Sequence, residues 1–193
     1  MRTHLVISFG LLTALTSAVL ASESYRFDPP RSTIGLTVHQ FLGTTHGRFT
    51  KFDGKIDIDR EHPEKSSVTS KIEVRSIDTG IVKRDNHLRS PEFFDVQKFP
   101  EITFKSRSVR QTGQQGGDIL GDLTMHGITK PTTLHVKLLS PMSSDTKETR
   151  WAVTTEPLKR SDFKLMFSQG TEAISGISQT VAVNIEIEAS RVQ

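Results

Sequence analysis

The chain has 193 residues, contains no cysteine and carries a formal net charge of +3, from 25 Lys and Arg against 22 Asp and Glu. The absence of cysteine excludes disulfide scaffolds and thiol-based catalysis. The basic residues are scattered and lie beside acidic ones, so no concentrated patch for nucleic acid is visible, and we expect no nucleic-acid partner.

The first segment of the chain, residues 1–21, has the layout of a secretory signal peptide. Arg2 gives a positive start, an apolar stretch runs from Leu5 to Leu20, and a cleavage-like site ends at Ala21. This run is shorter than the roughly 20 apolar residues that a membrane-spanning helix needs. We therefore expect cleavage after Ala21, export to the periplasm and a single mature domain over residues 22–193.

Most of the chain after Ser24 alternates between apolar and polar residues, which is typical of strands with one buried face. Turn signals separate the alternating segments, at 59–67, 111–118 and 140–149. About eight strands at short spacing predict an all-β sandwich or barrel. The alternating segments are 33–39, 52–59, 68–75, 102–104, 119–125, 134–138, 151–153 and 181–187.

The alternation fails in the middle of the chain, where we expect a short helical insert around residues 79–95. Asp78 or Thr79 is placed to cap a helix that runs through Leu88, and Pro91 is placed to begin a second turn. An insert between strands is expected to lie over one end of the barrel or to plug it.

Two glycines, Gly54 and Gly121, fall on the apolar faces of their predicted strands. Glycine weakens a strand unless the backbone must bend there or a neighbour must come close. The sequence leaves two interpretations open: a bulge or corner in the wall, or room for something inside the barrel.

Motifs of catalysis and metal binding are missing from the sequence. It contains no G-x-S-x-G elbow, no H-E-x-x-H pair, no phosphate loop and no dinucleotide fingerprint. Asp85, His87 and either Ser76 or Ser90 are the residue types of a triad, but nothing in their spacing favours one. We predict that the protein is not an enzyme and has no catalytic residues, cofactor or metal. Surface, turn or cavity-rim positions are the expectation for the histidines that match no zinc pattern, His39, His46, His87, His126 and His135.

Phenylalanine is abundant, with eleven residues against one Trp and one Tyr. Such rings can form a dry packed core. An eight-stranded barrel is either filled by side chains or holds one small ligand, and composition does not choose between these states.

Ordered motifs along nearly the whole mature chain resemble those of the YceI-like family, which are exported bacterial lipocalin-like proteins that bind polyisoprenoids. The resemblance implies an extended antiparallel lipocalin-like β-barrel of about eight strands with a helical insert and an elongated hydrophobic tunnel. One departure is Lys164, which stands where relatives commonly have Gly. The motifs that carry the resemblance are Phe27-Asp28, Ser32-Thr33-Ile34, Val38-His39, Thr45-His46-Gly47-Arg48-Phe49, Phe52-Asp53-Gly54, Ser76-Ile77-Asp78-Thr79-Gly80, Arg84-Asp85, His87-Leu88-Arg89-Ser90, Phe93-Phe94-Asp95-Val96, Phe99-Pro100-Glu101-Ile102-Thr103-Phe104, Gly121-Asp122-Leu123-Thr124, His126-Gly127 and Thr129-Lys130-Pro131.

This resemblance implies a carrier or storage protein that holds a long isoprenoid-type lipid, either a polyisoprenoid or an isoprenoid quinone. Five polar residues are expected either to contact a polar head group of the ligand or to attach the insert to the barrel: His39, His46, Asp85, His87 and Arg89. The residues expected to line the tunnel or close its mouth are Ile34, Leu36, Val38, Phe41, Phe49, Ile56, Ile72, Val74, Phe93, Phe94, Phe104, Leu123, Met125, Phe163 and Phe167.

Two other functions remain open at this stage. One is an enzyme that acts on a lipid or quinone inside the barrel, which needs an inward-facing polar cluster with shifted pKa values. The other is a stress-response barrel with a filled core that acts through a protein partner and exposes an apolar patch. Transient contact with a membrane or membrane protein is compatible with the carrier function, as are a monomer and a homodimer.

Overall fold

The computed structural model describes residues 22–140, 147–166 and 176–192. The predicted signal peptide and Phe167 therefore lie outside the described residues. The elements are β1 (Glu23–Phe27), η1 (Pro29–Arg31), β2 (Thr33–Gln40), β3 (Gly43–Phe49), β4 (Phe52–Ile58), η2 (Pro63–Lys65), β5 (Ser67–Glu73), η3 (Val74–Ser76), β6 (Ile77–Asp78), α1 (Val82–Arg89), β7 (Glu101–Gly113), β8 (Gly116–Met125), β9 (Ile128–Leu138), β10 (Glu148–Thr155), β11 (Leu158–Lys159), η4 (Arg160–Phe163) and β12 (Thr180–Arg191), where η marks a 3-10 turn.

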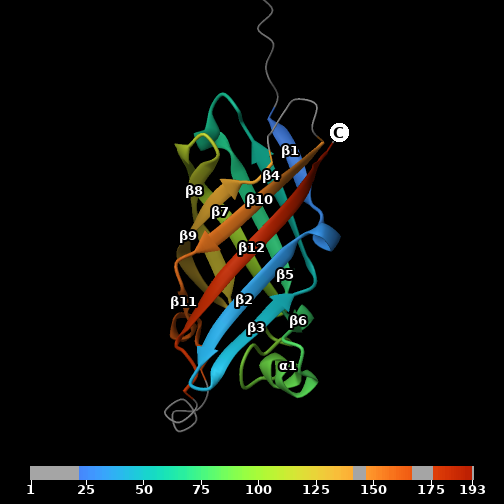
Figure 1. Ribbon diagram of the computed structural model, residues 1–193, viewed down its shortest axis with the longest axis vertical. Helices are drawn as coiled ribbons and strands as arrows, with labels where there is room; N and C mark the ends of the chain where they lie inside the picture. Colours follow the sequence, from blue (N-terminus) through green and yellow to red (C-terminus); the bar gives the residue numbers. More distant parts are fainter. Residues whose placement is uncertain (1–21, 141–146, 167–175, 193) are drawn as a thin grey trace, which may run out of the picture.

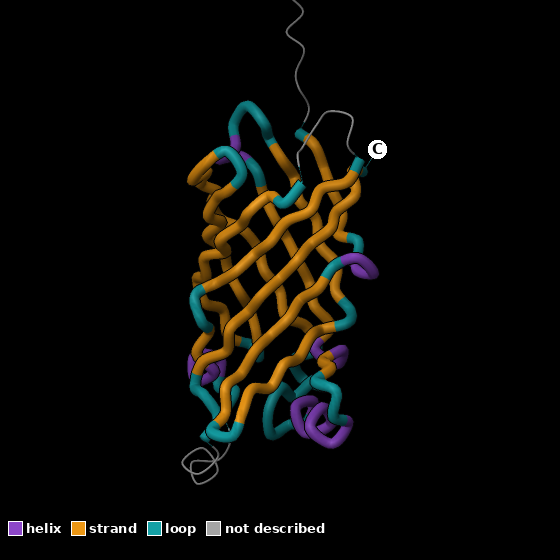
Figure 2. The backbone as a smooth tube through the Cα atoms, in the orientation of Figure 1, coloured by secondary structure: helices purple, strands orange, loops and turns teal. Residues whose placement is uncertain are grey.

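The strands form an antiparallel sheet that closes on itself. Neighbouring strands follow the order β1-β4-β5-β7-β8-β9-β10-β12, and β12 pairs again with β1. Figure 1 shows the resulting barrel with its long axis vertical, and Figure 2 shows the tilt of the strands across it. The predicted antiparallel barrel of eight strands is confirmed.

The last strand, β12, pairs along one edge with two strands in succession. Its C-terminal part, Ala189–Arg191, pairs with β1, and Ala182–Glu186 pairs with β2. The turn η1 separates β1 from β2, since Pro29 cannot donate a ladder hydrogen bond. In the lower half of Figure 1 the wall therefore continues through β2, β3 and the short β6.

The helical insert is present, and α1 lies at the lower end of the barrel in Figure 1, as predicted. Its expected cap is wrong: the N-cap is Ile81, which makes no side-chain capping hydrogen bond. Thr79 instead donates to the Asp85 carboxylate from its backbone N (3.0 Å) and its Oγ1 (2.5 Å). Within the described residues, no helix has the length and apolar character that crossing a membrane requires.

Some strand boundaries differ from the sequence prediction. The expected loop at 111–118 is mostly strand, because β7 and β8 continue to a tight turn at Gly113 and Gly116. A Cβ atom on Gly117 would lie 2.9 Å from the Arg110 carbonyl oxygen, so this glycine lets the two strands approach closely. Strand β3 was not predicted, because Gly43–Phe49 is mainly polar and glycine and shows no alternation of apolar and polar residues.

The two wall glycines make room for aromatic rings. A Cβ atom on Gly54 would lie 2.3 Å from the ring of Phe27, and one on Gly121 would lie 2.4 Å from the ring of Phe104. Gly121 also pairs with Ser106, directly before a register shift between Ser106 and Ser108 of β7. A β-bulge and a close approach of an aromatic ring therefore both occur at this glycine. The rings lie against the backbone of the wall.

A packed core occupies the α1 end of the barrel. The rings of Phe93 and Phe94 meet edge to face with centroids 5.2 Å apart, and Phe94 meets Phe49 in the same way at 6.3 Å. These rings fill the space between the insert and the wall. The buried core continues from this end to Tyr25 and Ala189, which lie in the β1–β12 pairing towards the other end. Its remaining members are Ile34, Phe52, Val74, Ile77, Val96, Ile102, Met125, Phe163, Leu165 and Ile187.

The substitution Gly54→Val tests the close approach of Phe27. The new side chain would displace the ring, and we expect overpacking of this kind to lower the free energy of unfolding by about 1–3 kcal/mol. Urea denaturation followed by Trp151 fluorescence measures the change. The matched control is Gly113→Ala, where a Cβ atom meets nothing within 4 Å. Equal urea midpoints for Gly54→Val and the unsubstituted protein would contradict this account.

Candidate functional site

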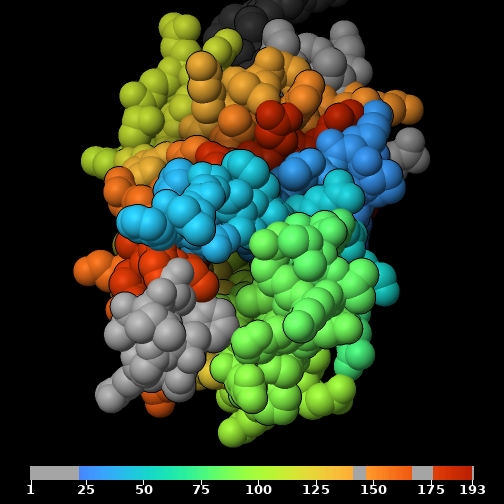
Figure 3. Space-filling model, turned by 60° about the horizontal axis from the view of Figure 1, so that its bottom comes forward, coloured from blue at the N-terminus to red at the C-terminus, as the bar shows by residue number. Residues whose placement is uncertain are grey.

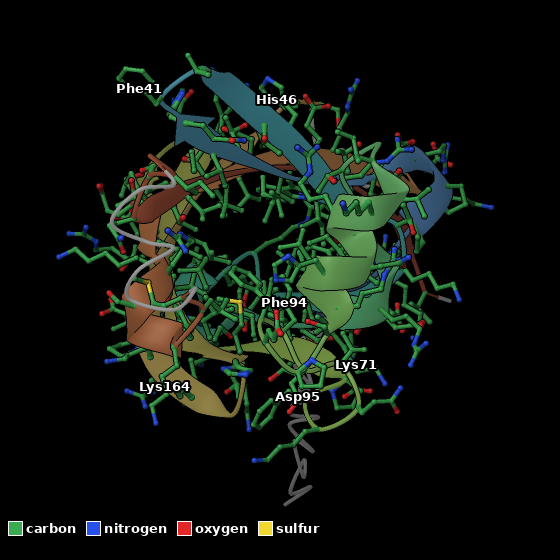
Figure 4. The ribbon with its side chains drawn as sticks, turned by 90° about the horizontal axis from the view of Figure 1, so that it is seen from below. Phe41, His46, Lys71, Phe94, Asp95 and Lys164 are labelled. Atoms are coloured by element: carbon green, nitrogen blue, oxygen red, sulfur yellow. The ribbon has the colours of Figure 1, made fainter. Side chains whose placement is uncertain are left out.

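The barrel encloses an elongated cavity of about 610 Å³. This volume lies within the roughly 300–1,000 Å³ typical of ligand pockets. Its lining extends from Thr79 and His87 at the α1 end to Gly113 in the β7–β8 turn at the other end. Figure 4 looks into the barrel from the α1 end. The alternative of a barrel filled by side chains is therefore wrong.

Most of the predicted tunnel residues lie along this cavity, because alternate side chains of each strand point inward. Whether they touch a ligand stays a prediction. The predicted residues in the lining are Ile34, Leu36, Val38, Phe49, Ile56, Ile72, Phe93, Phe94, Phe104, Leu123, Met125 and Phe163.

Two described residues of the predicted tunnel lie elsewhere. Val74 is 1% exposed and belongs to the packed core, because β5 ends at Glu73 and the alternation does not continue into η3. Phe41 is 88% exposed in the β2–β3 turn, past the end of the wall, and Figure 4 shows it at the outer rim. Neither side chain lines the cavity.

A large part of the lining was missed by the sequence prediction. The alternation along β9, β10 and β12 identified the strands, but it did not assign their apolar side chains to the cavity. That assignment requires the closed pairing order, which places these strands opposite β4, β5 and β7. The missed lining residues include Phe27, Leu134, Val136, Leu138, Trp151, Val153, Val181, Val183 and Ile185.

Polar groups gather around Arg84 at the α1 end of the cavity. Arg84 donates from Nε to Thr79 Oγ1 (2.7 Å), from Nη2 to the Thr79 carbonyl (2.8 Å) and from Nη1 to Thr45 Oγ1 (3.3 Å). All three residues line the cavity, together with Gln40 and His87. Arg84 thus joins the insert to β3 and places a cation beside the apolar interior, although the sequence prediction did not select it.

Asp85 and Arg89, which we predicted as head-group or structural contacts, hold the insert in place. Asp85 is buried, and its carboxylate accepts the two hydrogen bonds from Thr79. Arg89 donates to the carbonyl oxygens of Arg75 (2.8 Å) and Ile77 (2.6 Å). Neither residue lines the cavity, so the structural alternative applies to both.

The three histidines of the same prediction have different environments. His39 and His46 are exposed on the β2–β3 hairpin, where their Nδ1 atoms contact Thr44 Oγ1 (3.1 Å) and Thr37 Oγ1 (3.2 Å). Figure 4 shows His46 on the outer side of the hairpin. His87 is the one that lines the cavity.

A catalytic triad is not assembled around Asp85. Its carboxylate accepts from Thr79, and the hydroxyls of Ser76 and Ser90 each donate to a backbone carbonyl, at 2.7 and 2.8 Å. Among residues 22–140, 147–166 and 176–192, no group of three or more His, Asp and Glu is arranged to hold a metal ion.

The opposite end of the cavity carries an ion pair. Arg60 lines the cavity and donates from Nε and Nη2 to the Glu23 carboxylate, at 3.0 and 2.9 Å. The hydrogen bond from Arg60 holds the pKa of Glu23 below its usual range. The pair therefore stabilises the fold above a pH of about 4.3, the ordinary pKa of a glutamate, and this contribution is lost as the pH falls.

Comparisons with known proteins agree with this architecture. The sequence pattern that defines the YceI-like domain matches residues 25–189. Over 191 residues the chain is 35% identical to Protein YceI of Salmonella agona (strain SL483), with 97% of this chain and 96% of that protein covered. The crystal structure of BcnA from Burkholderia cenocepacia superposes with a TM-score of 0.76 at 22% identity and covers 85% of this chain and 99% of its own. A polyisoprenoid binding domain from Saccharophagus degradans superposes with a TM-score of 0.62 at 21% identity, covering 87% and 98%.

The substitution Asp85→Ala tests the structural function of this carboxylate. Loss of two hydrogen bonds to a buried charged acceptor is expected to lower the free energy of unfolding by roughly 2 kcal/mol. The control is Lys83→Ala, an exposed position on the same helix, which should change it by less than about 0.5 kcal/mol. Chemical denaturation provides the measurement. If Asp85→Ala left the stability unchanged, the carboxylate would not be what holds the insert.

Proposed function

The chain belongs to the YceI-like domain family, and from this premise we propose that it is an exported carrier or storage protein for one long isoprenoid-type lipid. The ligand class is a polyisoprenoid or an isoprenoid quinone. The observation that carries the proposal is the elongated apolar cavity inside a closed barrel. The Saccharophagus degradans domain, which has the same fold, is described as polyisoprenoid binding.

The energetics of burial favour a long apolar ligand. A lipid tail that buries about 500 Å² of apolar surface gains roughly 12 kcal/mol at 25 cal/mol/Å². Several kcal/mol are lost because the flexible tail and the complex lose freedom on binding. The difference leaves useful affinity, and it grows with the length of tail that the cavity accommodates.

The polar groups favour one orientation of the ligand. Arg84 and Thr45 carry hydrogen-bond donors at the α1 end, next to the apolar lining. An oxygen-bearing head group, such as a quinone carbonyl or a polyprenol hydroxyl, accepts such bonds. We place the head group there and the tail along the barrel towards the β7–β8 turn.

Binding without chemical change fits the lining better than catalysis does. Among the described lining residues, the one acidic side chain is Asp59, at the end opposite to Arg84. Its Oδ1 accepts hydrogen bonds from the backbone amides of Glu61 (3.1 Å) and His62 (2.8 Å). An acid already held by the backbone is poorly placed as a general base for a ligand in the cavity.

Native mass spectrometry of the protein purified from bacterial periplasm, followed by lipid extraction, tests the carrier function. We expect a one-to-one adduct that extraction identifies as an isoprenoid quinone or polyprenyl lipid. If the protein emerges without a lipid, a quinone and a polyprenol are added back. Failure of both to bind would refute the proposal.

The pair Val136→Trp and Lys137→Trp locates the ligand. These neighbours lie on the same strand; Val136 lines the cavity, opposite Gly117, whereas Lys137 is exposed. The Val136→Trp side chain is expected to occupy ligand volume and to weaken lipid binding at least about tenfold, whereas Lys137→Trp retains it. Titration with a quinone measures the affinity, and equal affinities of the two variants would place the ligand outside the cavity.

Export is tested by the intact mass of the periplasmic protein. The expected mature chain begins at Ser22, after removal of residues 1–21. The substitution Ala21→Asp puts a charge at the cleavage site and is expected to leave the precursor uncut and membrane-associated. Retention of residues 1–21 in the unsubstituted periplasmic protein would contradict the proposed processing.

A further inference from the structure

Four apolar side chains stand out because the fold leaves them in water. Phe41 and Leu42 are 88% and 93% exposed, and Ile81 and Val82 are 52% and 74% exposed. Every other exposed large apolar side chain among the described residues is at most 45% exposed. Large apolar patches on a protein surface mark sites of interaction with another protein or a membrane.

All four side chains lie at the α1 end of the barrel. Phe41 and Leu42 form the tip of the β2–β3 hairpin, and Ile81 and Val82 lie at the beginning of α1. Figure 1 shows the hairpin tip and α1 at the same end, and Figure 3 shows the hairpin (cyan) beside the α1 segment (green) on the face turned forward. We call these four residues the apolar rim.

The apolar rim adjoins the opening of the cavity. Gln40, which precedes the hairpin tip, lines the cavity, and so does Thr79, two residues before Ile81. The hydrogen bond from Arg84 to Thr45 connects the two halves of the rim at this opening. A surface bound to the rim therefore lies directly against the polar end of the cavity.

An exposed cation adjoins the apolar rim. Lys83 is exposed and follows Val82 directly, and no acidic residue occurs between Thr33 and Thr50. Of the acids near α1, Asp78 pairs with Arg48 (3.2 Å) and Asp85 is buried.

Charged groups of both signs lie further from the rim at this end (Figure 4), among them Asp95 and Lys98 in the segment after α1. Glu92 lies 3.2 Å from His87, and Asp162 is exposed on η4, two residues before Lys164. Figure 4 shows Lys164 on the rim of the same opening as Phe41. Exposed apolar groups with cations beside them are the combination that binds anionic lipid surfaces.

Building on the carrier function proposed above, we propose that the α1 end is a docking face for an anionic lipid bilayer, with the apolar rim inserted among the head groups. Phe41 and Leu42, at the tip of a hairpin that is hydrogen-bonded to Gly176, enter the interface, and Lys83 stays at the level of the anionic groups. The cavity then opens towards the membrane, so that a lipid tail passes from bilayer to barrel with little contact with water.

Co-sedimentation with vesicles tests the docking face. The probe is phosphatidylcholine vesicles with about one quarter phosphatidylglycerol, which carries the negative charge. We expect the mature protein to bind them, and the double substitution Phe41→Ser, Leu42→Ser to weaken binding about tenfold. Lys83→Gln is expected to weaken it about fivefold, and added salt to reduce binding of the unsubstituted protein.

A matched double variant, Leu139→Ser with Val192→Ser, controls for lost apolar surface. Val192 lies next to the chain end labelled C in Figure 1, at the other end of the barrel. Leu139 follows β9 and its backbone N donates to the Arg150 carbonyl of β10 (2.8 Å), and substitution of both residues should leave vesicle binding unchanged. No binding by the unsubstituted protein, or equal loss in both double variants, would overturn the proposal. Sedimentation velocity identifies the competing occupant: a dimer that Phe41→Ser, Leu42→Ser converts to a monomer would make the rim an interface between two copies.

Failure of the docking proposal is distinguishable from failure of the carrier proposal. The double variant at Phe41 and Leu42 should still bind a quinone added in detergent, because neither side chain lines the cavity. Val136→Trp should still bind vesicles while it loses the lipid. If the Phe41, Leu42 double variant and Val136→Trp each lost both vesicle binding and quinone binding, the two functions would not be separate.

Discussion

The closed hydrogen-bond ladder between β1 and β12 is the constraint on which the rest of the structure depends. Where β1 and β12 pair, the ring closes by hydrogen bonds and leaves no strand edge, so the wall there does not need a filled interior to complete its hydrogen bonds. Because β1 covers only the last part of β12, the remaining edge is taken by β2. The β2–β3 hairpin thereby becomes part of the wall and projects past it, which is how the closure of the barrel produces the exposed tip at Phe41.

An unfilled interior has a thermodynamic consequence that the α1 end offsets. Side chains that face a cavity lack dispersion contacts on one side, so they stabilise the fold less than core residues do. The buried cluster of Phe49, Phe93 and Phe94 supplies close packing at one end, and the hydrogen bonds from Thr79 to Asp85 hold the insert against it. The insert therefore packs against the wall beside the opening, where it stabilises the barrel and holds Arg84 at the cavity. In the remaining length, the ring of Phe27 lies close to Gly54, against the backbone of the wall.

The alternation of residues predicted much of the fold, and topology explains what it did not predict. Strands such as β2 and β4 were evident because their inner and outer residues differ strongly in polarity, whereas β3 was hidden by Gly47 and its polar neighbours. Alternation gives two faces to a strand but does not say which one faces a cavity and which a packed core, so it placed Val74 with the tunnel although this side chain lies in the packed core. Phe41 lies at the outer rim, outside the lining. Arg84 and Asp85 show the same limit in the insert: they are adjacent charged residues on a short helix, and only the packing of that helix decides that one faces the cavity and the other the core.

At the α1 end the polar groups lie at the opening and the apolar lining lies deeper in the barrel. This arrangement gives a physical reason for the head-group site and the docking face to lie at the same end. A lipid that left a bilayer head-first would carry its polar group through the apolar length of the barrel, where an unpaired polar group loses several kcal/mol of hydration. A lipid that enters tail-first through the α1 opening buries only apolar surface, and its head group arrives last, beside Arg84, Thr45 and Thr79. Tail-first entry thus requires polar groups at the opening that meets the bilayer. In this chain the apolar rim and the Arg84 cluster are at that same opening.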